Sequence, residues 1–189
     1  MIPAFRQDGQ LPRGRHTAQW LDFRLRYGQS QARKRLCAGL LGALHLLKSA
    51  GCRLAYIDGS FVSAKPEPGD FDICWDVTGV DTDLVPAVFF DFSAGRAAQK
   101  AEFGGEFFPA QLPEGLSGRA FLDYFQRDRD GQPKGIVALD LAKSAEAPPI
   151  YGLGMDSQRP SDGVIFVLRG YNISIEISIE ISIQIRRKV

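Results

Sequence analysis

The sequence predicts an α/β (α+β) fold in which helices flank a mixed central sheet. Segments with helical periodicity alternate along the chain with short apolar runs, and Gly, Pro and Asp residues bound these runs. The chain has 189 residues, of which 44% are hydrophobic, enough for one domain with a proper core. We divide it into an N-terminal arm with a short helix (1–28), a core (29–143), and a linker with a C-terminal β segment (144–189).

The first part of the chain contains the strongest helical patterns. Residues 1–14 are rich in Pro, Gly and Arg and predict an irregular arm, whereas aromatic residues at helical spacing predict a helix over 16–27. A leucine stripe with the helical period predicts a long helix that starts after Ser30, a candidate N-cap, and stops at Gly51.

Short apolar runs after this helix predict the strands of the sheet. Two shorter helical patterns and one glycine-containing turn interrupt the runs. We expect strands or extended segments at 52–57, 70–77, 86–92, 106–110 and 136–141, helices at 94–103 and 117–127, and the turn at 128–135.

The C-terminal segment has an unusual pattern. A strand is expected at 164–171, and residues 173–185 then alternate isoleucine with a polar residue over thirteen positions. A period of two is typical of a strand, whereas a near-perfect short repeat is typical of low-complexity sequence. The segment is therefore either an edge strand that pairs with another chain or, as we favour, a poorly specified tail.

Charge and cysteine usage exclude several functions. The formal net charge is +1, which gives no field strong enough for bulk binding to nucleic acid or to an anionic membrane. Cys37, Cys52 and Cys74 lack metal-ligand spacing, and with only His16 and His45 elsewhere a zinc site is not expected. We expect reduced, buried thiols in a cytoplasmic protein, with no signal peptide and no apolar run that spans a bilayer.

Two aspartates at the start of the predicted strand 70–77 are the main candidates for chemistry. Asp70 and Asp72 are two residues apart, so on a strand they would point to the same face. Such a pair repels itself unless a cation joins it, and carboxylate oxygens suit Mg²⁺, which keeps substrate phosphates and waters in its shell. The pair therefore predicts a metal site for a nucleotide, and the alternative is an acidic surface loop.

The turn ten residues earlier fits a phosphate site. Gly59 allows the backbone to approach a phosphate closely, and the hydroxyl of Ser60 with the following amides can donate to phosphate oxygens. Lys65, in the intervening loop, could neutralise a phosphate.

The order of these features resembles the nucleotidyltransferase superfamily, with its polymerase-beta-like fold. A helix and a strand precede Ile57-Asp58-Gly59-Ser60, and after a spacer Asp70-Phe71-Asp72-Ile73 opens the next strand. The resemblance covers about residues 30–92. The stretches around 69–76, 89–110 and 128–141 also resemble a small group of uncharacterised bacterial proteins with the same start.

The resemblance implies an enzyme that uses Mg²⁺ or Mn²⁺ to move a nucleoside monophosphate from a nucleoside triphosphate to an acceptor. Asp70 and Asp72 would hold the metals, and Gly59 and Ser60 would cradle the phosphates. Asp91, in the predicted strand 86–92, would be the third carboxylate and metal ligand and would help to activate the acceptor. Asp140 is the alternative third ligand. The acceptor (a small molecule, RNA or protein) stays open, because no helical acceptor-binding domain is evident.

Two other functions remain as alternatives. A catalytically inactive protein of this fold would serve as a partner-binding module, for instance in a toxin–antitoxin or defence pair. A nucleic-acid binder that works through the basic N-terminal arm is the weaker alternative, because the overall charge is balanced. Arg96 with Lys100, and the basic run Arg33–Arg35, are either anion contacts or ordinary solvated surface.

Overall fold

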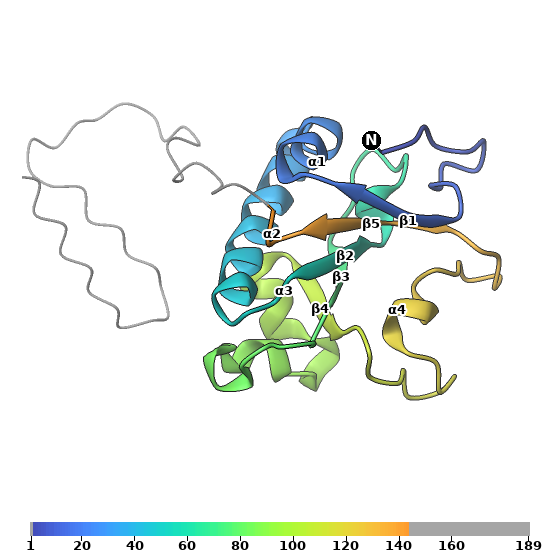
Figure 1. Ribbon diagram of the computed structural model, residues 1–189. Coiled ribbons are helices and arrows are strands. Elements are labelled where there is room, and N and C mark those ends of the chain that lie inside the picture. The colour runs from blue at the N-terminus through green and yellow to red at the C-terminus, as the bar shows by residue number, and fades with distance from the viewer. Residues whose placement is uncertain (1, 144–189) are drawn as a thin grey trace, which may run out of the picture. The chain divides into compact units, whose positions relative to one another are not determined.

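The computed structural model describes residues 2–143, so the predicted linker and C-terminal β segment lie outside the described residues. One sheet organises this part of the chain, in the strand order β1-β5-β2-β3-β4 (Figure 1). Strand β2 runs antiparallel to both its neighbours, whereas β1 pairs with β5, and β3 with β4, in parallel. The expected mixed sheet is confirmed. The strands are β1 (Gly14–Ala18), β2 (Leu54–Asp58), β3 (Phe71–Trp75), β4 (Gly105–Pro109) and β5 (Gly135–Asp140).

Helices cover both faces of the sheet, unequally. Helices α1 (Trp20–Tyr27), α2 (Gln31–Ser49) and α3 (Ala97–Phe103) contribute to the larger apolar cluster on one face, and the single turn α4 (Phe121–Tyr124) packs against the smaller cluster on the other. Figure 1 shows this division, with α4 on the opposite side of the strands from α2. Among residues 2–143, none of the helices combines the length and apolar character needed to cross a bilayer.

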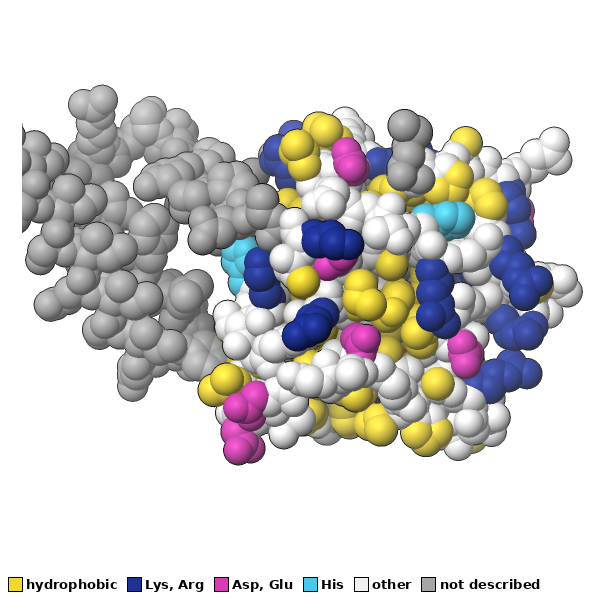
Figure 2. All heavy atoms as spheres, in the orientation of Figure 1, with side chains coloured by type: hydrophobic (Ala, Val, Ile, Leu, Met, Phe, Trp, Pro, Cys, Tyr) yellow, Lys and Arg dark blue, Asp and Glu magenta, His cyan; other side chains and the backbone are white. Residues whose placement is uncertain are grey.

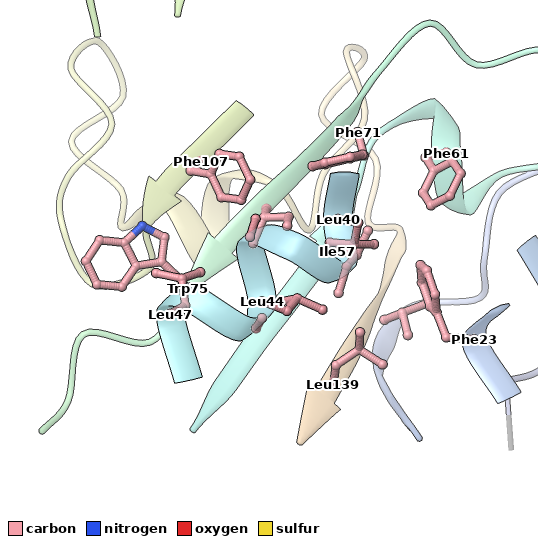
Figure 3. Close-up of a cluster of buried hydrophobic side chains, with 14 of the residues drawn as sticks. Phe23, Leu40, Leu44, Leu47, Ile57, Phe61, Phe71, Trp75, Phe107 and Leu139 are labelled. Carbon is pink, nitrogen blue, oxygen red and sulfur yellow. The ribbon is translucent and has the colours of Figure 1, made fainter. Parts of the chain in front are cut away.

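The larger core forms between α2 and the sheet. Leu40, Leu44 and Leu47 recur on one side of α2 and point at Ile57 of β2 and Leu139 of β5 (Figure 3). All five are at most 4% exposed. Burying each such side chain contributes about 1.5–3 kcal/mol, so this stripe fixes α2 against the sheet.

The ends of α2 follow the predicted signals. The side-chain oxygen of Ser30 accepts a hydrogen bond from the backbone N–H of Arg33, and the helix ends before Gly51, which has a φ of +96°. Gly39, within the helix, lies against the backbone carbonyl of Phe103, so closely that a Cβ atom there would overlap it. The helix therefore makes its close approach to the end of α3.

Several expected elements differ from the structure: the helix expected at 16–27 starts at Trp20, and the helix expected at 117–127 is only Phe121–Tyr124. The run 86–92 is not a strand, because Ala87–Phe90 forms a 3₁₀ helix that starts after Pro86. The N-terminal region also contains a strand that periodicity missed, since β1 joins the sheet beside β5. The irregular arm before it packs onto the core through Leu11, which is 1% exposed.

Candidate functional site

Three carboxylates form a row across β2, β3 and β4, at one end of these strands. Asp58, the last residue of β2, lies opposite Asp72 of β3, and Asp72 lies beside Glu106 of β4 in the parallel register. We call these three residues the carboxylate row. Because side chains alternate along strands, the row faces the α4 side, the same side as Tyr56 and Phe108.

One end of the row is paired with a lysine. Nζ of Lys134 lies 2.8 and 2.7 Å from the two carboxylate oxygens of Asp58, whose side chain is 4% exposed. The two residues are 76 positions apart in the chain, and Lys134 immediately precedes β5. Burying a carboxylate without such a partner would destabilise the folded state, so the ion pair with Lys134 offsets the cost of burying Asp58 in the sheet.

The other end of the row carries two cations from α3 and its N-terminal boundary. Nζ of Lys100 lies 2.5 Å from Glu106 and 3.2 Å from Asp70, and it thereby bridges the two acids. Arg96 approaches Glu106 at 3.6 Å while its guanidinium group lies over the ring of Phe108. Sequence analysis interpreted Arg96 and Lys100 either as anion contacts or as solvated surface, and the structure shows that both contact the carboxylates of this site.

The middle of the row holds excess negative charge. Burial and, to a smaller extent, the carboxylates of Asp58, Glu106 and Asp70 together raise the pKa of Asp72 to about 7, while Lys134 opposes them. Burial also raises the pKa of Asp58, against the opposing effect of Lys134. Asp72 is thus the position in the site that gains most from an added cation.

The predicted glycine turn lies directly against this position. Gly59 has a φ of +79°, a conformation that favours glycine, and a Cβ atom there would overlap the carboxylate of Asp72. Ser60 follows as the first residue of a 3₁₀ turn (Ser60–Val62). The strand end, the turn and the acid that sequence analysis grouped together are adjacent.

A buried arginine holds the loop that follows the turn. The guanidinium group of Arg33, which is 7% exposed, donates to five backbone carbonyls. Four belong to the loop, namely Phe61 at 2.7 Å, Ser63 at 3.2 Å, Lys65 at 2.5 Å and Pro66 at 3.2 Å, and the fifth is Tyr27 at 3.4 Å. Interpreting the whole run Arg33–Arg35 as exposed surface is therefore wrong for its first residue.

The structure unites some of the predicted site residues and separates others. Asp70, Asp72, Gly59 and Ser60 lie around the same end of β2 and β3. Lys65 is exposed, and its backbone is held in place: its carbonyl accepts from Arg33 and its N–H donates to the hydroxyl oxygen of Ser63.

Neither candidate for the third carboxylate belongs to the row. Asp140 pairs with Leu54, at the opposite end of β2 from Asp58. Asp91 follows the 3₁₀ helix, and its carboxylate accepts hydrogen bonds from the N–H and hydroxyl groups of Ser93, which lower its pKa.

Glu106 occupies the place that was expected for Asp91. It lies on the next strand after Asp72 that runs parallel to β3. The extended run 106–110 was predicted, but the third carboxylate was expected on a strand at 86–92, which the structure does not contain. Glu106 alternates with the buried residues Gly105 and Phe107, and this strand pattern was the feature of the sequence that could have identified it.

The donor set of the site is compatible with a magnesium ion that takes part of its shell from a substrate. Within residues 2–143, no group of three or more His, Cys, Asp or Glu side chains is arranged to hold a metal ion. The carboxylates of Asp58, Asp70 and Glu106 all disfavour the charged form of Asp72, so the charge on Asp72 is incompletely compensated. Mg²⁺ commonly uses one or two carboxylates together with substrate phosphates, so Asp70 and Asp72 fit that mode of binding.

Comparison with known proteins shows that most of the chain matches one family model. A family model described as "Family of unknown function (DUF6932)" matches residues 3–140, a range that includes the carboxylate row and its lysine and arginine neighbours. No curated protein and no solved structure matches the chain.

Proposed function

We propose that this chain, which belongs to the family of unknown function DUF6932, catalyses Mg²⁺-dependent nucleotidyl transfer at the carboxylate row. The donor would be a nucleoside triphosphate, and the acceptor a hydroxyl group on a small molecule, RNA or protein. The buried free thiols Cys37, Cys52 and Cys74 support a cytoplasmic setting for the reaction.

The observation that carries the proposal is the meeting of Gly59 with Asp72. The glycine turn lies against an incompletely compensated carboxylate, and the half-buried Ser60 beside it would donate its hydroxyl group to a phosphate. Asp70 is two residues before Asp72 and 40% exposed, so it can reach a ligand from solvent. A bound Mg²⁺ would join these carboxylates to the phosphates of the substrate.

In this reaction the acceptor oxygen attacks the α-phosphorus, and the bond from that phosphorus to the bridging oxygen of the β-phosphate breaks. Pyrophosphate leaves with the bonding electrons. Asp70 and Asp72 would hold Mg²⁺, which when bound neutralises phosphate charge and orients the leaving group. Glu106, in place of Asp91, would accept the proton of the acceptor hydroxyl, and the turn at Gly59 and Ser60 would bind the phosphates.

One observation favours the second candidate function, an inactive module that binds a protein partner. Lys134 is bonded to Asp58, and Lys100 is bonded to Glu106 and Asp70, so internal cations already engage three of the four acids. A site in which these lysines have replaced the metal would keep the fold without the reaction.

The decisive experiment is incubation with each α-labelled nucleoside triphosphate and Mg²⁺. Label transfer and pyrophosphate release are compared between the parent and the variant Asp70→Ala/Asp72→Ala. We expect at least a hundredfold loss in the variant. Triphosphate binding that requires Mg²⁺, measured by calorimetry, serves as the second readout.

The chain offers a matched control. Asp81 and Asp83 have the same spacing, but both are exposed: Asp81 caps a 3₁₀ turn (Thr82–Leu84), and Asp83 lies within it. Asp81→Ala/Asp83→Ala should leave transfer and binding unchanged. Transfer that survives the loss of Asp70 and Asp72 would end the proposed mechanism, and triphosphate binding without any transfer would favour the inactive module.

A further inference from the structure

Four arginines line a cavity beside the α4 region. Arg13 and Arg15 come from the start of the chain, and Arg119 and Arg127 from the segments that flank α4. We call these four residues the arginine basin. The cavity has a volume of about 440 Å³, and Asp123 is the one carboxylate among its lining residues. Figure 2 shows Lys and Arg side chains gathered along one rim of the molecule, on the side of the loops that precede β1 and β5.

Most of the positive charge in the basin is uncompensated. Arg15 approaches Asp123 at 3.7 Å, and Arg127 donates to the backbone carbonyl of Gly131. The guanidinium groups of Arg13 and Arg119 have no hydrogen bond or ion pair within residues 2–143. Four guanidinium groups against one carboxylate leave a formal charge of +3 around a concave space.

The basin lies on the same face of the sheet as the carboxylate row. Arg15 pairs with Ile136 in the parallel register of β1 and β5. Val137 lies opposite Ile57, so the antiparallel register carries Ile136 to the position opposite Asp58. Arg15 is therefore two strands from Asp58, about 10 Å at the usual strand spacing. A ligand of moderate length could contact both.

We propose that the arginine basin binds a ligand that carries two or more phosphate groups. A guanidinium group donates two parallel hydrogen bonds to one phosphate, so four of them match more than one phosphate. The volume also exceeds what a single phosphate fills. The polyphosphate of a nucleotide and the backbone of a single-stranded nucleic acid share this chemistry. The proposal does not require catalysis, because the basin and the carboxylate row have no residue in common.

Binding of two probes to the 189-residue chain tests the proposal. Inorganic tripolyphosphate is titrated by calorimetry, and a labelled ten-nucleotide RNA by fluorescence anisotropy, both without divalent metal. The variant Arg13→Gln/Arg119→Gln removes the two unpaired guanidinium groups. The control Arg24→Gln/Arg35→Gln removes the same charge from exposed positions on α1 and α2.

We expect the basin variant to weaken binding of at least one probe tenfold or more, and the control to change it less than twofold. The log–log dependence of RNA binding on salt should also become less steep by about 1.4, or 0.7 for each lost phosphate contact. The tighter probe identifies the source of the phosphates. Equal losses in the two variants, or no saturable binding of either probe, would overturn the proposal. Asp70→Ala/Asp72→Ala should bind normally, so failure of the basin and failure of the transfer reaction are distinguishable.

Discussion

The backbone at Gly59 lies so close to Oδ2 of Asp72 that the acid has room only because residue 59 has no side chain. The contact joins the end of β2 to the second residue of β3, across the register that pairs Asp58 with Asp72. It ties the turn geometry to the position of the acid, and the two cannot be changed separately.

Gly59→Ala should therefore damage both stability and function. A non-glycine residue at a φ of +79° costs about 1 kcal/mol, and displacement of the Asp72 carboxylate adds to that. We expect a loss of about 1–3 kcal/mol in the free energy of unfolding, measured by urea denaturation. Triphosphate binding should fall in parallel.

Gly69→Ala is the matched control for this change. A Cβ atom at residue 69 would meet no atom within 4 Å, and its φ lies outside the left-handed region. Its stability should stay within about 0.5 kcal/mol of the parent. If the two alanine variants unfold at the same urea concentration, the close contact between Gly59 and Asp72 does not contribute to stability.

The third carboxylate can be identified by comparing three conservative substitutions. Glu106→Gln should lower kcat for nucleotidyl transfer by about a hundredfold or more, because it removes the acid beside Asp72. Asp91→Asn and Asp140→Asn should change kcat less than threefold, since neither side chain belongs to the row. The reverse ranking, with Asp91 essential, would contradict the assignment of Glu106.

Local patterns predicted much of the fold. The leucine stripe and Ser30 gave α2, because amphipathic period and capping are properties of neighbouring residues. The spacing of Asp70 and Asp72 likewise predicted a shared face at the start of a strand. Gly59 was placed beside them by element order along the chain.

The remaining features depend on contacts that neighbours in sequence do not reveal. Lys134 reaches Asp58 across 76 residues, and Arg33 is buried by a loop 28 or more residues later. The run 86–92 is apolar enough for a strand, but Pro86 starts a 3₁₀ helix whose carbonyl at Phe89 is bonded by the buried side chain of Gln99. Tertiary contacts decided these cases, and the carboxylate of Asp91 is bonded to Ser93 outside the row.

Arg33 should be essential for the loop that follows the glycine turn. Arg33→Met leaves the carbonyls of Phe61 and Ser63 in the interior without their donor, at about 1–3 kcal/mol for each unsatisfied group. We expect a total loss of about 2–5 kcal/mol in the free energy of unfolding. Amide hydrogen exchange should show faster exchange over residues 60–66 than over α2.

The neighbouring Arg35 supplies the control, since it lies on the same helix and is exposed. Arg35→Met should leave both stability and exchange close to the parent values. Arg33→Lys should recover only part of the loss, because an ammonium group cannot reproduce the fork of donors. Full rescue by lysine would mean that charge alone matters at this position.

The raised pKa of Asp72 predicts a specific dependence of stability on pH. The folded pKa is about 7 against an ordinary 3.8, so the folded protein binds the proton more tightly than the unfolded chain. The contribution of Asp72 is therefore most favourable below about pH 4 and is lost as the pH rises through about 7. A pKa difference of this size corresponds to at most about 4 kcal/mol.

Asp72→Asn removes this titration while Asp58, Asp70, Glu106 and Lys134 stay in place. We compare the free energy of unfolding of the variant with that of the parent by urea denaturation. The difference, variant minus parent, should be about 1–3 kcal/mol larger at pH 8 than at pH 4.5. Asp130→Asn, at an exposed position, should show no such difference. Mg²⁺ at pH 8 should then stabilise the parent and not Asp72→Asn, because only the parent presents the carboxylate that a cation would compensate. A stability difference that stays constant between the two pH values would show that Asp72 carries no excess charge in the folded protein.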